Sequence, residues 1–296
     1  MSDFHTSVLL TETINLLNVR KDKNYIDATL GGGGHTFEIL KHGGNVLGLD
    51  VDQEAIDFVR SKNPDSGFKN KLIIAKGNFR DIERLSRENK FENVSGVIFD
   101  LGVSSHQLDS VGRGFSFRYD ALLDMRMDKE LQIKAMDLLR VLTKGELYEL
   151  FYKYGEDRFA KRVASNIVES RRIKPIESTV DLINIVEKSI PRLNYQIHPA
   201  TRIFQALRIA VNDELQSLEE GLEGAYKLVT DNGVIVIISF HSLEDRMVKH
   251  TFKKWEEAGL GINLTKKPIL PSETEIRNNS RSRSAKLRGF KKHRYL

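Results

Sequence analysis

Short apolar runs alternate with amphipathic stretches over the first hundred residues. These runs lie at 25–30, where Asp27 and Thr29 interrupt the apolar residues, and at 46–49, 72–75 and 97–99. Runs of this length, bounded by polar or glycine residues, are typical of parallel strands that are buried on both faces. Helical spacing occurs between them, as after Asp52, where Ile56 and Val59 share one face. The pattern predicts an alternating β/α sheet.

Between residues 100 and 234 the apolar spacing becomes helical. Thr143 with Glu146, and Ser178 with Asp181, have the spacing of capping boxes, which mark helix starts. From 201 to 229 apolar residues recur every three or four positions, which predicts one long amphipathic helix. This part of the chain is therefore predicted to be helical.

The next strand-like run, 234–239, returns the chain to the sheet. We therefore predict an α/β domain formed by residues 1–104 and 212–296, with a helical domain of residues 105–211 inserted between the fourth and fifth strands. Such an insertion lies at the carboxyl end of the sheet, where ligands bind in open α/β folds. It is positioned to hold a substrate.

A turn made only of glycine, 31–34, separates the first strand from the following helix, and the second strand ends in Asp50. Glycines let the N–H groups of a helix N-terminus approach a ligand that carries negative charge. The acid at the end of the second strand can accept both ribose hydroxyls. A glycine-rich turn is also found in plain flexible loops, but the flanking strands and Asp50 favour an adenosine-cofactor site.

The residues after the glycines narrow the choice of cofactor. A P-loop continues with Lys and Ser/Thr, whereas His35 and Thr36 stand here, which disfavours nucleoside triphosphates. A dinucleotide site has a third glycine where this chain has Thr36. S-adenosyl-L-methionine has no pyrophosphate, so it needs only the turn, N–H groups for its carboxylate and an acid for its ribose. The sequence favours this cofactor.

The composition excludes several kinds of chemistry. The 296 residues include no cysteine, which excludes disulfides, thiolate zinc sites, iron–sulfur clusters and the usual cysteine-dependent methylation at pyrimidine carbon-5. The N-terminus lacks the features of a signal peptide, and no apolar stretch approaches the ~20 residues of a membrane span. We expect a cytoplasmic protein that does not enter the membrane.

The chain carries a net charge of +5, and its basic residues gather near the end. After Glu275 no acid follows, while eight cations do: Arg277, Arg281, Arg283, Lys286, Arg288, Lys291, Lys292 and Arg294. One interpretation is a solvated basic tail. The other is a segment that contacts nucleic acid.

The segment after the fourth strand has the richest chemistry. Asp100 ends that strand at the cleft, where side chains approach the reacting atoms, although an Asp there can also cap the next helix. Guanidinium and aromatic groups then interleave at Arg113, Phe115, Phe117 and Arg118. This combination suits stacking on unpaired bases and pairing with phosphates. The alternative is that the two phenylalanines pack at the domain junction.

His241 follows the fifth strand and precedes two acids. It has the position of a residue that orients a substrate, but residues 242–245 also have the pattern of an ordinary helix start. No cluster of His, Asp and Glu has the spacing of a metal site, so we expect no metal.

Ten ordered segments match one known family. They lie at 5–10, 27–35, 100–107, 112–117, 123–128, 155–160, 198–202, 204–209, 239–246 and 282–288. Together they resemble the RsmH (MraW) family and cover nearly the whole chain. The resemblance implies a Rossmann-like class I S-adenosylmethionine methyltransferase sheet with an inserted helical domain. It also implies methylation of the N4 amino group of a decoding-centre cytosine in the 16S rRNA of the small ribosomal subunit, and it is compatible with a homodimer.

The resemblance also assigns cofactor contacts. These are Gly33, Gly34, His35, Asp50 at the ribose, Phe79 at the adenine, Asp100 and Gln107. The candidate contacts to the RNA are Arg113, Phe115, Phe117, Arg126, His241 and Arg283.

The amino nitrogen of cytosine is a poor nucleophile because its lone pair is delocalised into the ring. An enzyme gains by aligning this nitrogen with the sulfonium methyl and by accepting hydrogen bonds from its N–H groups. DNA amino-methyltransferases use Asp/Ser-Pro-Pro-Tyr after the fourth strand, but residues 100–103 contain no proline or aromatic residue. We predict that Asp100 acts as an acceptor together with Ser104 or Ser105.

Three other functions are weighed against this one. The first is a methyltransferase that acts on DNA or another RNA, and the second is an RNA-binding assembly factor without catalytic activity. The third is a nicotinamide oxidoreductase, which the missing third glycine disfavours. Calorimetry with S-adenosylmethionine and with NAD separates the cofactors.

Overall fold

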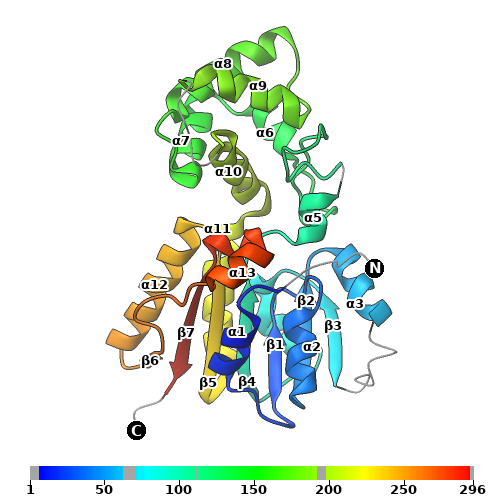
Figure 1. The fold of residues 1–296 in the computed structure, drawn as a ribbon, viewed down its shortest axis with the longest axis vertical. Helices are drawn as coiled ribbons and strands as arrows, with labels where there is room; N and C mark the ends of the chain where they lie inside the picture. The colour runs from blue at the N-terminus through cyan, green and yellow to red at the C-terminus, as the bar shows by residue number, and fades with distance from the viewer. Residues whose placement is uncertain (1–6, 63–70, 111, 192–197, 294–296) are drawn as a thin grey trace. The chain divides into compact units, whose positions relative to one another are not determined.

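The computed structural model describes residues 7–62, 71–110, 112–191 and 198–293, except for the side chain of Ser105. The chain forms two compact units (Figure 1). Unit 1 consists of Met1–Ser104 and Leu215–Leu296, and unit 2 of Ser105–Glu214. The second boundary thus lies slightly later than the predicted 211/212. The N-terminal motif at 5–10 lies partly outside the described residues.

Unit 1 contains a seven-stranded sheet with the order β3-β2-β1-β4-β5-β7-β6. The strands are β1 (Asn24–Asp27), β2 (Asn45–Asp50), β3 (Leu72–Lys76), β4 (Val94–Asp100), β5 (Val229–Ser239), β6 (Gly261–Asn263) and β7 (Lys286–Lys292). The first five pair in parallel, and β7 is antiparallel to both β5 and β6. This order confirms the predicted Rossmann-like class I sheet.

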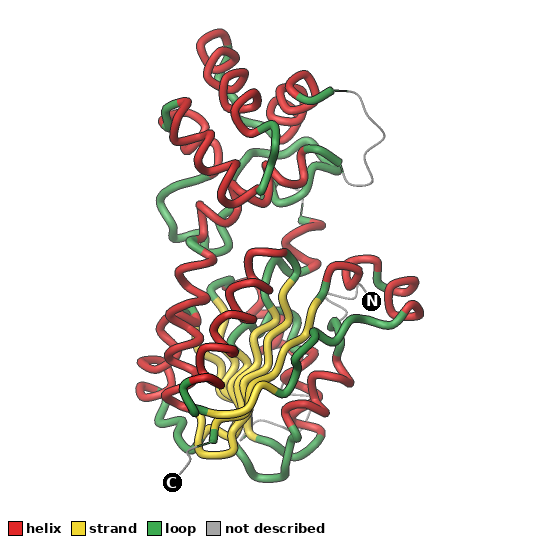
Figure 2. The backbone as a smooth tube through the Cα atoms, turned by 90° about the vertical axis from the view of Figure 1, so that its left-hand side faces the viewer, coloured by secondary structure: helices red, strands yellow, loops and turns green. Residues whose placement is uncertain are grey.

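Helices cover both faces of this sheet, as Figure 2 shows. One core joins the strands to α4 (Ile82–Glu88), α11 (Glu214–Leu228) and α12 (Ser242–Glu257). The other core joins them to α1 (Leu10–Leu17), α2 (Gly34–Lys41) and α3 (Gln53–Lys62). Since both faces are buried, the strands have continuous apolar runs rather than alternating ones.

Unit 1 also contains three short elements. They are the 3-10 helices η2 (Phe79–Asp81) and η3 (Ser280–Ser284), and the helix α13 (Glu273–Asn278). No helix of the described ranges is both long and apolar enough to cross a membrane.

Unit 2 is helical. Its helices are α5 (Ser105–Asp109), α6 (Ala135–Val141), α7 (Lys144–Gly155), α8 (Ala160–Ile173), α9 (Thr179–Ser189) and α10 (Ala200–Asn212). The two predicted capping boxes are confirmed, because Thr143 caps α7 with Glu146 and Ser178 caps α9 with Asp181. Each cap satisfies N–H groups that a helix start leaves without a partner.

The prediction of one helix over 201–229 was wrong. The chain forms α10 and α11, separated by Asp213 in the left-handed region with φ 50°. The side chain of Asn212 donates to the carbonyl of Met125 at 2.8 Å and accepts from the N–H of Met127 at 2.7 Å. This contact with the 125–127 segment accompanies the end of α10, and the apolar spacing does not reveal it.

The basic C-terminal segment is not a solvated tail. Its residues 286–292 form β7, which lies between β5 and β6 inside the sheet. Leu287 and Phe290 belong to the two different cores of unit 1. The strand predicted at 234–239 starts earlier in the structure, because β5 begins at Val229 and has an irregular register opposite Val94 and Gly96.

Candidate functional site

Three carboxylates lie at the carboxyl ends of neighbouring parallel strands in unit 1. Asp27 ends β1, Asp50 ends β2 and Asp100 ends β4, in the strand order β2-β1-β4. Parallel strands bring these ends to the same edge of the sheet, where ligands bind in open α/β folds. The edge therefore combines negative charge with the glycine turn that follows β1.

The glycine turn leads into α2 without a side-chain cap. Gly33 is the N-cap of α2, with φ 77°, and it has no side chain that could accept a hydrogen bond from the N–H groups of the first turn. The N–H groups of the first turn of α2 therefore suit an anionic group such as the carboxylate of S-adenosylmethionine.

The glycines are also required by the protein itself. A Cβ at Gly33 would lie 2.9 Å from the ring of Phe37 and 3.0 Å from Val59, and a Cβ at Gly34 would overlap the Ser7 hydroxyl. The positive φ of Gly33 adds strain for any other residue. Substitution here is expected to perturb packing as well as ligand binding.

Asp50 holds the turn in place. Its Oδ2 accepts the N–H of Gly31 at 2.8 Å, and its Oδ1 accepts the N–H of Asp52 at 2.9 Å. Burial raises the pKa of Asp50 to about 6, although these two N–H groups oppose the rise. Each carboxylate oxygen can accept a second hydrogen bond, so the group suits two ribose hydroxyls.

Asp100 lies beside His35, the second residue of α2. The Nε2 atom of His35 is 3.4 Å from Oδ2 of Asp100, and the side chains are 5% and 10% exposed. The backbone N–H of Asp100 donates to Oγ1 of Thr29 at 2.6 Å. His35 Nδ1 is buried without a hydrogen-bond partner among the described residues. Such a polar atom fits a site whose remaining partner is a ligand.

Asp27 belongs to the same cluster, but we did not predict it as a site residue. Its carboxylate accepts Oγ1 of Thr36 at 2.7 Å and the N–H of Thr29 at 3.2 Å. Burial raises the pKa of Asp27, and the negative charge of Asp100 adds to this rise. His35 and the two hydrogen bonds oppose it. The available signal was an acid at the end of a strand, four residues before the first glycine of the turn.

Phe79 follows β3, next to the end of β2. The N–H of Gly77 donates to the carbonyl of Asp50 at 2.9 Å, which brings the two strand ends together. Phe79 packs edge-on against Phe99 at 5.5 Å between ring centroids, and a Cβ at Gly221 would come within 2.8 Å of its ring. The half-buried Phe79 ring is therefore held in place by its packing against Phe99 and Gly221.

The remaining cofactor and catalytic candidates lie at the start of unit 2 or next to it. Ser104 is the last residue of the first segment of unit 1, and it is half-buried. Gln107 is buried in α5 of unit 2. The side chain of Ser105 lies outside the described part of the structure.

In unit 2, the two arginines predicted to bind RNA are engaged inside the unit. Arg126 makes a bidentate ion pair with Asp124 at 2.6 and 2.8 Å, and its third nitrogen donates to the carbonyls of Lys129 and Leu131. Arg113, which is 8% exposed, donates to the carbonyls of Arg126 and Met127, each at 3.0 Å. These guanidinium groups organise the loop that contains them.

The two phenylalanines also pack within unit 2. Phe115 is buried, with the guanidinium of Arg113 5.7 Å from its ring centre. Phe117 is half-buried, and its ring lies 5.4 Å from Phe204 and 4.9 Å from His198.

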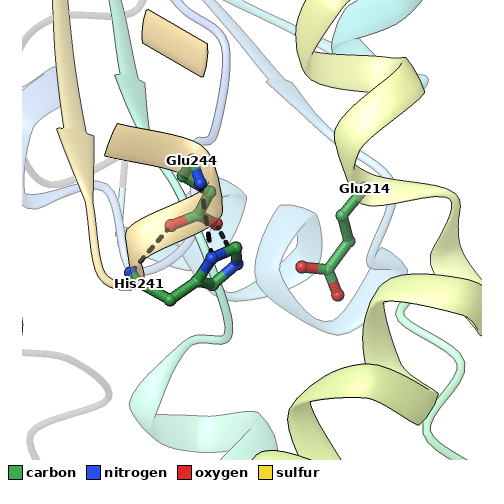
Figure 3. Close-up of side chains that lie close together, drawn as sticks. All are labelled: Glu214, His241 and Glu244. Carbon is green, nitrogen blue, oxygen red and sulfur yellow. Dashed lines mark hydrogen bonds and ion pairs between the residues drawn. The ribbon is translucent and has the colours of Figure 1, made fainter. Parts of the chain in front are cut away.

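His241 caps α12. Its backbone N–H donates to Oε2 of Glu244 at 3.2 Å, while its Nδ1 accepts the N–H of Glu244 at 3.4 Å (Figure 3). This reciprocal pair is a capping box. Figure 3 also draws Glu214, whose carboxylate accepts two hydrogen bonds from Arg208 within unit 2 at 2.8 and 2.9 Å.

The basic C-terminal residues divide into buried and exposed groups. Arg288 is buried and forms an ion pair with Asp245 at 2.7 Å, and Lys292 donates to the carbonyls of Tyr226 and Val229. Arg283, a predicted RNA contact, is exposed in η3.

Comparisons with known proteins place the chain in a family. Residues 2–293 match the model of the MraW methylase family. The ribosomal RNA small subunit methyltransferase H of Carboxydothermus hydrogenoformans is 44% identical, with 97% of each chain covered. The protein of the same name from Citrifermentans bemidjiense is 45% identical, with 99% of this chain and all of the relative covered. A solved rRNA methylase structure from Streptococcus thermophilus covers 98% of both chains at 11% identity, with a TM-score of 0.48. On the family match and the two relatives, the chain belongs to the MraW methylase family.

Proposed function

We propose that this protein transfers a methyl group from S-adenosyl-L-methionine to the N4 amino group of a decoding-centre cytosine in 16S rRNA. The observation that carries the proposal is the cluster of Asp27, Asp50 and Asp100 beside the uncapped start of α2. The names of the relatives, ribosomal RNA small subunit methyltransferase H, support an RNA substrate.

Unit 1 binds the methyl donor in this proposal. The first turn of α2 receives its carboxylate, Asp50 receives its ribose hydroxyls, and Phe79 packs against its adenine. His35 supplies a buried nitrogen at the same edge. Gln107 is proposed to complete the polar contacts.

S-adenosyl-L-methionine supplies an electrophilic methyl group on a sulfonium centre. The cytosine nitrogen would form the new bond to this carbon while the carbon–sulfur bond breaks with its electron pair left on sulfur, and the nitrogen would then release a proton to solvent. Asp100 accepts an N–H of the amine, which directs the nitrogen lone pair and stabilises the positive charge that develops on nitrogen. The Nε2 atom of His35 lies beside this carboxylate, 3.4 Å from Oδ2 of Asp100. Ser104 and Ser105 are proposed as further acceptors.

The product identifies the reaction. Small ribosomal subunits from cells that lack this gene are incubated with the protein and labelled cofactor, and the nucleosides are analysed by mass spectrometry. We expect label on N4 of one cytosine and none on carbon-5, since the chain has no cysteine for the covalent route. Label on a ribose oxygen or a ring carbon would refute the proposed acceptor.

The role of Asp100 is tested in the same assay. Asp100→Ala is expected to lower kcat by more than it raises the Kd for the cofactor, because its bond to the amine matters most in the transition state. Asp50→Ala is the matched comparison, and we expect it to weaken cofactor binding instead. Equal losses of turnover and affinity in Asp100→Ala would limit Asp100 to cofactor binding.

The cytoplasmic location and a homodimer stay predictions.

A further inference from the structure

Four exposed cations of unit 2 lie around the start of α8. Arg158 comes directly before the N-cap of α8, and Lys161 and Arg162 lie in its first turn. Arg202, in the first turn of α10, joins them because its Nη1 donates to the carbonyl of Glu156 at 2.8 Å. We call these four residues the α8 cationic face.

The nearby acids leave this face basic. Asp157 is buried, and its carboxylate accepts the N–H of Phe159 at 2.6 Å. Burial raises the pKa of Asp157. The N–H of Phe159 and the positive charges of Arg202 and Arg158 oppose this rise, so both arginines lie near the Asp157 carboxylate. Glu156 adds one exposed carboxylate. The cations of the face therefore outnumber the acids beside them.

The dipoles of α8 and α10 do not favour cations at these positions. The N-terminal end of a helix carries partial positive charge, so cations there oppose the helix dipole. Neither α8 nor α10 has an acid in its first turn. Other cations of unit 2 do form ion pairs, such as Arg126 with Asp124 and Arg208 with Glu214. On the α8 cationic face Asp157 offsets part of the charge of Arg158 and Arg202, and the exposed positive charge that remains is typical of a surface that binds a polyanion.

The face also offers a flat group for a base. The guanidinium carbon of Arg158 lies 4.7 Å from the centre of the Phe159 ring. A guanidinium held over an aromatic ring presents a planar surface on which an unpaired base can stack, while neighbouring cations pair with phosphates.

We propose that the α8 cationic face binds the RNA substrate, with its cations on the phosphate backbone and the Arg158–Phe159 pair beneath an unpaired base. This inference rests on the proposed function for the RNA class of the ligand. It places RNA contact here rather than at Arg113 and Arg126, whose side chains are mostly buried, whereas Arg202 donates to the Glu156 carbonyl and stays exposed.

The test is the salt dependence of RNA binding. The Kd for small ribosomal subunits that lack the modification is measured against KCl concentration for wild type and for Arg158→Gln, Lys161→Gln, Arg162→Gln and Arg202→Gln, singly and combined. Each phosphate contact contributes about 0.7 to 0.9 to the slope of log K against log salt, so each substitution is expected to flatten the slope by about that amount. Arg172→Gln, an exposed cation in the last turn of the same helix, is the matched control and should keep the slope.

Two further measurements separate binding from folding. The melting temperature of the Lys161→Gln/Arg162→Gln double variant should stay equal or rise, because both cations lie at the start of α8, and the affinity of the combined variant for S-adenosylmethionine should not change. A combined variant with the wild-type slope would overturn the inference while the proposed function stands. If wild-type protein neither bound the subunits nor methylated them, the proposed function would fail, and the inference with it.

Discussion

Asp50 gives the site a pH dependence, because its pKa lies at about 6. Below this value the carboxyl is protonated in the free protein and no longer accepts two hydroxyl donors. The cofactor therefore binds the ionised form, and its affinity should rise with pH. We expect binding to be about tenfold weaker at pH 5 than at pH 7, since one pKa unit corresponds to a factor of ten.

Asp50→Ala checks this assignment by calorimetry at both pH values. At pH 7 the loss of a charged acceptor should cost ~1.5–3 kcal/mol of binding free energy. At pH 5 the difference from wild type should shrink, because the wild-type carboxyl is then mostly protonated. A difference that is the same at both pH values would assign the ribose to another residue.

At the scale of elements, β7 depends on a buried ion pair with α12. Arg288 and Asp245 are 5% and 12% exposed at their side chains, and Lys286 also reaches Asp245 at 3.1 Å. Burial by itself would raise the pKa of Asp245, but the hydrogen bonds from Arg288 and Lys286 outweigh it and lower the pKa. Breaking a buried pair leaves an uncompensated charge, at a cost of about 3–5 kcal/mol.

Arg288→Ala should therefore lower the free energy of unfolding by about 3 kcal/mol at pH 7, at the lower end of that range because Lys286 remains. Because folding lowers the pKa of Asp245, its carboxylate stabilises the protein at pH values above the ordinary pKa of an aspartate. This contribution is lost as pH falls through the folded-state pKa. The difference between variant and wild type in urea unfolding should accordingly narrow below pH 4. Arg283→Ala, an exposed neighbour, should change stability little, and an equally large effect there would contradict the ion-pair explanation.

At the scale of the molecule, unit 2 is one continuous segment with its own core. Buried residues on four of its helices are Leu147, Phe151, Val163, Ile167, Leu182, Val186, Ile203 and Leu207. A segment of this size can bury enough apolar surface to fold alone. Residues 105–214 expressed alone should give a helical circular dichroism spectrum and a cooperative thermal transition.

This isolated unit should also bind RNA with a salt-dependent affinity, but it should not bind S-adenosylmethionine. If calorimetry detected binding of S-adenosylmethionine to the isolated unit, this result would contradict the proposal that unit 1 holds the cofactor. A folded segment that does not bind RNA would contradict the role proposed for unit 2.

The sequence by itself determined the features that depend on neighbours along the chain. The strand, glycine turn and helix leading to Asp50, and the caps at Thr143 and Ser178, follow from backbone freedom, local hydrogen bonds and apolar spacing. The place of the insertion between β4 and β5 also follows from this order. Such signals need only a few consecutive residues.

Only the tertiary structure decided how the charged groups are used. The basic residues 286–292 have the composition of a solvated tail, yet Asp245 lies far away in sequence and neutralises Arg288 inside the sheet. Arg126 likewise donates its guanidinium hydrogen bonds to Asp124 and to carbonyls of its own loop. A charge pattern does not specify its partner, because the energy of a cation depends on which groups surround it in space.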